Sequence, residues 1–385
     1  MKLLHLGDLH LGKTLAEFVL IEDQKYILEQ VMDIIKDQAV DGVLIAGDVY
    51  DKSIPSEQAT VLLDCFLKDL SESGAKTFMI SGNHDSDERL NFGSSLFESN
   101  QIFISSIYDG ALHKYTVEDD CGEVDIYLMP FVKASQVRAF FPNEKIHTYE
   151  DAVRVIISNA GINRERRNVL VAHQFVAGRF EDPKLGGSES AGTQTVGLVE
   201  KIGFDCFEDF DYVALGHIHS PQKVGRDTIR YSGSILKYST SEVNNEKSVP
   251  IITLGKKGEV DIEIVPLRPM RNMRHIKGKL KDLLDKKNVE GQDDFIYATL
   301  TDEDVVNDAM GILRATYPNT IRIDYDNAHT KELEQVDISK IAENKSFSEL
   351  VGDFYRLVYG RDISEEEMDV MREVAREAGV INEAD

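Results

Sequence analysis

The sequence contains no tryptophan and only three cysteines in 385 residues. Cys65, Cys121 and Cys206 are odd in number, widely spaced and without a CxxC pair. Neither a disulfide framework nor a thiolate zinc site is therefore expected. The sequence also lacks a GxxxxGK[ST] phosphate loop, so we expect no ATP site in this chain.

Long hydrophobic runs are absent as well. No stretch approaches the roughly 18 uninterrupted apolar residues of a membrane span. The opening residues, MKLLHLGDLHLGK, make a poor signal peptide because His5, Asp8 and His10 interrupt them. These absences and the unpaired cysteines predict a soluble, cytoplasmic protein that does not associate with membranes.

Basic charge is scarce, since 43 Lys and Arg residues face 68 Asp and Glu residues and the formal net charge is -25. This balance argues against a protein that holds nucleic acid through its overall charge. The length exceeds what a single core usually supports, so we expect two or three domains. A hydrophobic content of 42% is ordinary for a globular protein.

Short apolar runs recur along the chain, and each ends at a polar cluster. They cover residues 3–6, 42–46, 76–80, 168–172 and 211–216. Continuous runs of this length without alternation predict strands that are covered on both faces. Helical apolar patterns at residues 26–35 and 62–70 separate the first three runs, which predicts a βαβαβ order.

Polar side chains follow all five predicted strands, at the end where α/β sheets bind ligands. Those with the chemistry of metal ligands are Asp8, His10, Asp48, Asn83, His173, His217 and His219. Two carboxylates, one amide and four imidazoles are too many ligands for one ion but suit two ions that share a carboxylate. Asp48 is the natural bridge. Such mixed shells accept Mn(II), Fe(II) or Zn(II).

Each polar cluster also has an ordinary interpretation when it is taken alone. GDVYD is typical of a turn after a strand, His173 of a hydrogen-bonded core histidine, NHD of a helix N-cap, and HIH of alternate positions on a strand. Five clusters at the same end of five strands favour one shared site over five unrelated features.

The blocks D-x-H, GD, GNHD, H and GHxH resemble those of the calcineurin-like metallophosphoesterases. The longer stretches DLHLGK, GDVYDKSIPS, GNHDSDERLNFGS, DYVALGHIHSPQKV and YSGSILKYSTSE resemble the SbcD family of bacterial nucleases. The resemblance is dense to about residue 240. It implies an α/β fold: a phosphoesterase sandwich of β-sheets flanked by helices (1–266), a small α/β capping domain that receives DNA (267–335) and a C-terminal helical hairpin (336–385).

The resemblance also implies roles for individual residues. One Mn(II) would be held by Asp8, His10, Asp48 and His219, and the second by Asp48, Asn83, His173 and His217. Fe(II), Zn(II) and Mg(II) are the alternative ions. His84 would be a catalytic residue that does not bind metal, with Asp85 as its partner. The candidate substrate contacts are Asp51, Ser86, Arg89 and Lys237.

The activity that the resemblance implies is 3′ to 5′ exonuclease action on double-stranded DNA, with endonuclease action on hairpins, in replication, recombination and end processing. ATP dependence would come from the SbcC ATPase subunit, which would bind the C-terminal segment. We expect a homodimer of this chain within a heterotetramer.

Two features of the C-terminal third support this organisation. Residues 268–287 carry eight Lys or Arg residues against two Asp residues. They begin an α/β alternation, with strands predicted at 273–277, 295–301 and 320–325 and helices at 279–285 and 305–317. Capping boxes at Ser346 with Glu349 and at Ser364 with Glu367 predict two amphipathic helices. The basic residues could instead cover a solvated face, and the hairpin could pack on its own chain.

Two other functions remain open from the residues alone. A two-metal phosphoesterase acting on nucleotides or phosphoproteins would use the same five blocks, and the acidic charge favours it. A binding scaffold that has lost catalysis is the other alternative, and the intact set of ligand residues argues against it.

Overall fold

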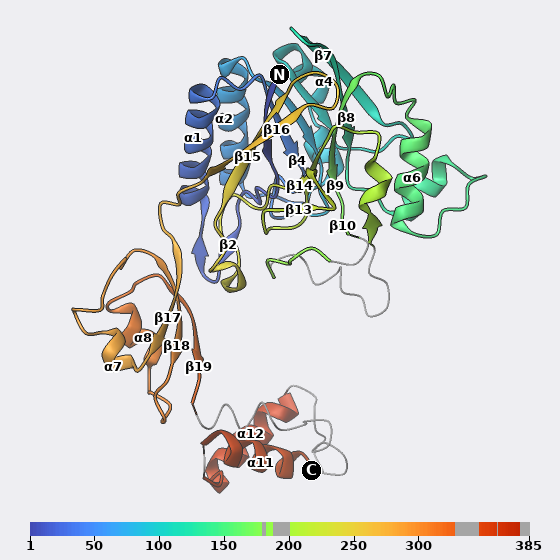
Figure 1. Cartoon of the computed structure of the whole chain (residues 1–385). Coiled ribbons are helices and arrows are strands. Elements are labelled where there is room, and N and C mark those ends of the chain that lie inside the picture. Colours follow the sequence, from blue (N-terminus) through green and yellow to red (C-terminus); the bar gives the residue numbers. More distant parts are fainter. Residues whose placement is uncertain (179–181, 188–200, 328–345, 360, 378–385) are drawn as a thin grey trace. The chain divides into compact units, whose positions relative to one another are not determined.

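The computed structural model describes residues 1–178, 182–187, 201–327, 346–359 and 361–377 (Figure 1). The chain divides into two compact units, Met1–Asn272 and Met273–Asp385. The sequence predicted three domains with boundaries at 266 and 335. The second of these boundaries lies outside the described residues, and the three-domain division stays a prediction.

The first unit contains two six-stranded sheets. The first sheet has the order β16-β15-β1-β4-β5-β6, in which β1, β4, β5 and β6 are parallel, β15 is antiparallel to β1, and β16 is antiparallel to β15. Its strands are β1 (Lys2–Leu6), β4 (Gly42–Ala46), β5 (Lys76–Ile80), β6 (Ile102–Ser105), β15 (Ser248–Leu254) and β16 (Val260–Pro266). Helices α1 (Ile21–Asp37) and α2 (Glu57–Ser73) connect β1, β4 and β5 and lie side by side (Figure 1), as the βαβαβ prediction requires.

The second sheet has the order β13-β14-β12-β9-β8-β7. Its strands are β7 (His113–Asp119), β8 (Gly122–Met129), β9 (Arg167–His173), β12 (Tyr212–Gly216), β13 (Gln222–Val224) and β14 (Arg226–Tyr231). The four inner strands are parallel, and β7 and β13 are antiparallel to their neighbours. Helices α5 (Ala134–Phe140) and α6 (Tyr149–Asn159) precede β9.

The two sheets pack face to face, and alternate residues of one strand enter different cores. Val169 and Val171 of β9 pack with Leu44 of the first sheet. Leu170 lies on the opposite face of β9, in a cluster with Ile156 of α6. Each central strand is therefore buried on both faces, which explains its continuous apolar run. The predicted sandwich of sheets flanked by helices is confirmed.

Short elements complete the first unit. They are β2 (Thr14–Leu15), β3 (Phe18–Val19), α3 (Asp87–Asn91), α4 (Ser94–Phe97), β10 (Val176–Ala177), β11 (Ile202–Gly203) and 3-10 turns at Glu98–Asn100, Phe204–Phe207 and Thr240–Glu242. The ends of α2 show how local sequence sets a boundary. Ser56 accepts a hydrogen bond from the Ala59 backbone N–H at the start, and Gly74 adopts a φ of 80° at the end.

The second unit contains a parallel three-stranded sheet of β17 (Met273–Gly278), β18 (Phe295–Leu300) and β19 (Thr320–Tyr325). Helices α7 (Leu280–Leu283) and α8 (Ala309–Arg314) pack apolar side chains on β18. The sequence predicted strands at 273–277, 295–301 and 320–325, which the structure confirms within one residue. It predicted longer helices, at 279–285 and 305–317. Helix α8 begins later because Asp308 is its N-cap and accepts from the Gly311 N–H.

The C-terminal hairpin consists of α11 (Phe347–Tyr359) and α12 (Glu365–Glu377). Both predicted capping boxes form. The Glu349 carboxylate accepts from the Ser346 N–H at 2.8 Å, and the Glu367 carboxylate accepts from the Ser364 N–H at 2.9 Å. Within the described ranges, every helix is too short or too polar to cross a bilayer.

Candidate metal centre

The predicted ligands lie at the carboxyl ends of five strands of the two sheets, in the loops that follow or, for His173, at the last residue of the strand. Strands β1, β4 and β5 belong to the first sheet, and β9 and β12 belong to the second. These strand ends contribute Asp8, His10, Asp48, Asn83, His173, His217 and His219, and the structure brings all seven together. The site therefore lies where the carboxyl ends of two facing sheets meet.

A first group of ligand atoms surrounds His10. Its Nε2 lies 3.1 Å from Nε2 of His219 and 3.5 Å from Oδ2 of Asp48. The ligand atoms of Asp8, His10 and His219 all lie within 4.8 Å of one another. Four side chains thus point their ligand atoms at one small volume.

A second group surrounds Asn83. Its Oδ1 lies 3.1 Å from Nε2 of His173 and 2.9 Å from Nδ1 of His217. Oδ2 of Asp48 is 3.4 Å from Nε2 of His173. The same Asp48 oxygen therefore approaches both groups, which is the bridging position that the sequence suggested.

Four of these residues have a left-handed backbone that side chains other than glycine rarely adopt. The φ angles are 53° at Asp8, 45° at His10, 48° at Asp48 and 102° at His217. Each costs about 1–3 kcal/mol and persists only where its surroundings enforce it. Hydrogen bonds between the loops do so here: the Asp8 N–H donates to the Gly47 carbonyl at 3.1 Å, and the His217 N–H donates to Asp8 Oδ1 at 2.8 Å.

Close approach between loops requires glycine at two positions. A Cβ at Gly82 would collide with the Asp48 carboxylate, and a Cβ at Gly216 would collide with the Ala46 carbonyl. The contacts bring the loop after β4 against the loops after β5 and β12. The absence of a side chain at these glycines thus lets ligands from different strands meet.

Burial controls the charge of the imidazoles. It lowers the pKa of His10 to about 4 and that of His217 to about 3. Burial also acts to lower the pKa of His173, but the Asp48 carboxylate outweighs it and raises that pKa to about 9. Near neutral pH, His10 and His217 are therefore uncharged and carry a lone pair that can bind a cation.

The two ligand carboxylates differ in their electrostatic environment. Burial raises the pKa of Asp8. Burial acts in the same direction on Asp48, but His173 outweighs it and holds the pKa of Asp48 well below its usual range. The bridging carboxylate is thus the more strongly ionised of the two.

The residues fit a divalent cation. Asp8 Oδ2 is buried and has no hydrogen-bond partner among the described residues. The Nε2 atoms of His10 and His219 lie 3.1 Å apart, so their two lone pairs can be directed at one cation. A cation would satisfy the carboxylate oxygen and both lone pairs, and the oxygen and nitrogen donors suit Mn(II), Fe(II) or Zn(II).

The environment of His84 and Asp85 corrects one expectation. Asp85 does not contact the His84 imidazole. Its carboxylate accepts from the backbone N–H groups of Val49, Tyr50 and Gly82 at 3.1, 2.8 and 2.9 Å. His84 Nδ1 instead lies 3.0 Å from the backbone carbonyl of Asp51. Asp85 therefore joins the loops after β4 and β5, because its buried carboxylate accepts from backbone N–H groups of both.

The four candidate substrate contacts have different environments. Asp51 is half-buried at the site, and its Oδ1 lies 2.7 Å from Lys13 Nζ and 3.5 Å from His10 Nδ1. Ser86 is the N-cap of α3, and Arg89 on that helix is exposed. Lys237 donates to the Val243 carbonyl at 2.7 Å and to Asn272 Oδ1 at 3.1 Å. Of the four, Asp51 contacts a predicted ligand, His10.

Residues that were not singled out from the sequence support the ligands. Gln24 of α1 is fully buried and donates to the His10 carbonyl at 2.7 Å, and Tyr238 donates to the Leu9 carbonyl at 2.5 Å. The Glu242 carboxylate lies 3.6 Å from Nδ1 of His219. Tyr238 and Glu242 are in the stretch YSGSILKYSTSE, so the motif contained the signal, but no spacing rule assigns them a role.

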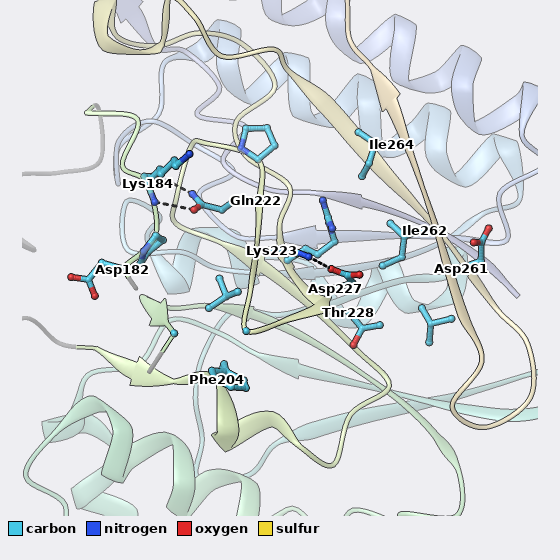
Figure 2. Close-up of a pocket in the computed structure, with 17 residues that line it drawn as sticks. Asp182, Lys184, Phe204, Gln222, Lys223, Asp227, Thr228, Asp261, Ile262 and Ile264 are labelled. Carbon is cyan, nitrogen blue, oxygen red and sulfur yellow. Dashed lines mark hydrogen bonds and ion pairs between the residues drawn. The ribbon is translucent and has the colours of Figure 1, made fainter. Parts of the chain in front are cut away.

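A separate hollow of about 1160 Å³ lies beside β13, β14 and β16 (Figure 2). Its charged side chains are of both signs, and Lys223 pairs with Asp227 at 2.5 Å. Gln222 accepts from the Lys184 N–H at 2.8 Å. The lining contains none of the predicted ligands.

Fewer of the basic side chains in the segment 268–287 are available to bind an anion than the composition suggested. Arg271 forms a two-point ion pair with Asp23, which is 1% exposed. Arg274 pairs with Asp294 at 2.7 Å, and Lys277 pairs with Asp326. Three of the eight cations therefore have carboxylate partners within their own unit.

Comparisons with known proteins agree with the fold and with a divalent metal centre. A family model described as calcineurin-like phosphoesterase matches residues 1–221, so the chain belongs to that family, whose centre holds divalent metal. The SbcD_C model, described as the Type 5 capsule protein repressor C-terminal domain, matches residues 269–359. The SbcD subunit of the nuclease SbcCD from Staphylococcus epidermidis (strain ATCC 12228 / FDA PCI 1200) is 32% identical over 381 residues, which is 97% of each chain. Within the phosphoesterases, the chain is therefore a member of the SbcD family, as the motifs predicted.

A solved structure, a dimetal phosphatase from Danio rerio (LOC 393393), is 9% identical with a TM-score of 0.36. The match covers 70% of this chain and 99% of that one. This score is too low to show a common fold, and the family model carries the assignment.

Proposed function

We propose that the protein is a metal-dependent DNA nuclease, with 3′ to 5′ exonuclease activity on double-stranded DNA and endonuclease activity on hairpins. The observation that carries the proposal is the two groups of ligand atoms that share Asp48 Oδ2, with His84 beside them. Membership of the SbcD family supports DNA as the substrate. Replication, recombination and end processing are the settings in which such an activity would serve.

The distances support one assignment of ligands. Asp8, His10, Asp48 and His219 would hold one ion, and Asp48, Asn83, His173 and His217 would hold the other. Mn(II) is our first choice, with Fe(II), Zn(II) and Mg(II) as alternatives. Two bound cations would neutralise the phosphodiester and make water a stronger nucleophile near neutral pH.

His84 is positioned to give a proton to the leaving oxygen. A carbonyl oxygen only accepts hydrogen bonds, so Nδ1 of His84 donates to the Asp51 carbonyl. This bond orients the ring and makes Nε2 the nitrogen that would face the leaving oxygen. The His84 backbone N–H donates to Asp48 Oδ1 at 2.8 Å, which ties the acid to the bridging carboxylate.

The C-terminal hairpin is the proposed binding site for the SbcC ATPase. Phe354, Val370 and Val374 are 60%, 59% and 56% exposed. Apolar side chains that are this exposed on paired amphipathic helices are typical of a protein interface. SbcC would supply the ATPase, with a homodimer of this chain in a cytoplasmic heterotetramer.

A second candidate function is hydrolysis of phosphoester bonds in nucleotides or phosphoproteins. The ion pairs of Arg271, Arg274 and Lys277 favour it, because they reduce the positive charge available for a DNA backbone. Small substrates would need only the metal centre.

Incubation with linear duplex DNA and Mn(II), without ATP, tests the proposal. The DNA is labelled at one end of each strand in turn, and a small phosphodiester is assayed in parallel. Shortening from 3′ ends is the expected result. Intact DNA with active hydrolysis of the small phosphodiester would favour the second candidate. His84→Ala should retain the bound metal and lose at least about 100-fold in rate on both substrates. Loss of metal from this variant would refute the role of His84 as a proton donor.

A further inference from the structure

The imidazole of His219 has a buried carboxylate on the side opposite the metal centre. Glu242 Oε1 lies 3.6 Å from Nδ1 of His219, whose Nε2 faces His10. Glu242 is 0% exposed. An ionised carboxylate in such a place needs a partner, and Lys247 Nζ lies 2.5 Å from Glu242 Oε2.

Lys247 connects this ion pair to the loop that carries His219. Its ammonium also donates to the His219 carbonyl and to Ser234 Oγ, both at 2.8 Å. The side chain is 4% exposed. One buried cation thus holds the backbone of His219 and the carboxylate behind its ring in a single arrangement.

The other imidazole of the first group has a similar environment. Asp51 Oδ1 lies 3.5 Å from Nδ1 of His10 and 2.7 Å from Nζ of Lys13. In the second group, His173 Nδ1 instead faces the uncharged carbonyl of Ala46 at 2.8 Å. The Nδ1 atoms of the two imidazoles of the first group therefore face carboxylates, and Nδ1 of His173 faces a neutral oxygen.

A carboxylate behind Nδ1 has two effects on a metal-binding imidazole. It keeps the proton on Nδ1, so that the lone pair of Nε2 is directed at the ion. It also makes Nε2 a stronger electron donor. Both effects favour a divalent cation, and a neutral carbonyl provides the second effect more weakly.

We infer that Glu242, held by Lys247, is a positioning residue that orients His219 and strengthens the binding of one divalent cation in the group of Asp8, His10, Asp48 and His219. The inference rests on the proposed metal centre. It makes the two ion sites unequal, because the carboxylate acts on one of them.

Titration of the full, metal-free chain with Mn(II) tests this inference. Electron paramagnetic resonance of free Mn(II) gives the number and affinity of the sites. The wild-type chain should bind two ions. Glu242→Gln keeps the shape of the side chain and removes its charge, and it should weaken one site by about 10–100-fold and leave the other unchanged. The visible absorption of the Co(II)-loaded variant should change as well, because it reports the ligand shell.

Two further variants separate positioning from a structural effect. Glu242→Gln leaves the Lys247 ammonium buried without its carboxylate, so the double variant Glu242→Gln/Lys247→Met removes that charge too. The double variant should keep the weakened site. Asp211→Asn is the matched control: Asp211 is 8% exposed and pairs with Lys257 at 2.8 Å, at the opposite end of β12. It should lower the thermal midpoint and leave both Mn(II) affinities and the Co(II) spectrum as in the wild type.

The outcomes are distinct. Unchanged affinities in Glu242→Gln would overturn the inference and leave the proposed function standing. Recovery of the weakened site in the double variant would also overturn it, because the loss would then come from an unpaired buried charge. A wild-type chain that binds neither Mn(II) nor Co(II) would overturn the metal centre and the inference together.

Discussion

At the scale of single residues, we expect Asp85 to contribute mainly to the stability of the fold and not directly to the reaction. Its carboxylate satisfies three backbone N–H groups in the loops that carry Asp48 and Asn83. Asp85→Ala would leave these groups buried without an acceptor, so we expect the free energy of unfolding to fall by about 3 kcal/mol. Asp85→Asn keeps one acceptor oxygen and should lose less. Urea denaturation of the metal-free variants measures both changes.

An opposite outcome would restore the role that the sequence suggested. If Asp85→Ala unfolded at the wild-type urea concentration but lost activity, the residue would act on His84 rather than on the loops. The sequence could predict the ligands because imidazoles and carboxylates at strand ends have a distinctive chemistry. It could not predict the partners of Asp85, because two of them, Val49 and Tyr50, are backbone groups more than 30 residues away. Glu242 was missed for the same reason, since no spacing rule connects it to His219.

At the scale of elements, the burial of β1 on both faces makes the stability of the fold depend on pH through His5. Burial lowers the pKa of His5 from 6.5 to about 3. Between these values the unfolded chain binds a proton that the folded chain does not, so the free energy of unfolding falls as the pH falls. The slope from this group is about 1.4 kcal/mol per pH unit, and it vanishes above pH 6.5. His5→Gln should remove that slope. Urea denaturation between pH 7 and pH 5, with a chelator present, compares the two chains.

Only the slope decides this prediction, because His5→Gln also changes packing and lowers stability at every pH. Equal slopes in the two chains would mean that His5 binds its proton while β1 stays folded. The element scale is also where sequence analysis succeeded best. The limits of β4 and β5 follow from apolar runs that stop at Gly47 and Ser81. The distribution of the five strands between two sheets could not be read from such runs, because a strand that is buried on both faces has the same pattern in either sheet.

At the scale of the whole molecule, the hairpin and the metal centre should be separable in function. The cores of the sandwich are formed by residues of the first unit, and the hairpin residues α11 and α12 lie beyond them in the chain. Phe354→Glu/Val374→Glu places two charges at positions that are already exposed, so the fold should persist. We expect the variant to lose binding to SbcC by at least about 100-fold, because charges at the centre of an apolar interface would be desolvated without partners. Its Mn(II)-dependent hydrolysis of a small phosphodiester should equal that of the wild type.

The control for this experiment lies on the same unit but outside the hairpin. Val305 is 52% exposed, and Val305→Glu adds the same kind of charge away from the proposed interface. It should co-purify with SbcC as the wild type does. Co-purification of Phe354→Glu/Val374→Glu with SbcC at the wild-type level would mean that SbcC binds outside the hairpin. Loss of hydrolysis in that variant would mean that the hairpin supports the metal centre. Hydrolysis of a small phosphodiester does not require SbcC, so a surface that only binds SbcC should not affect it.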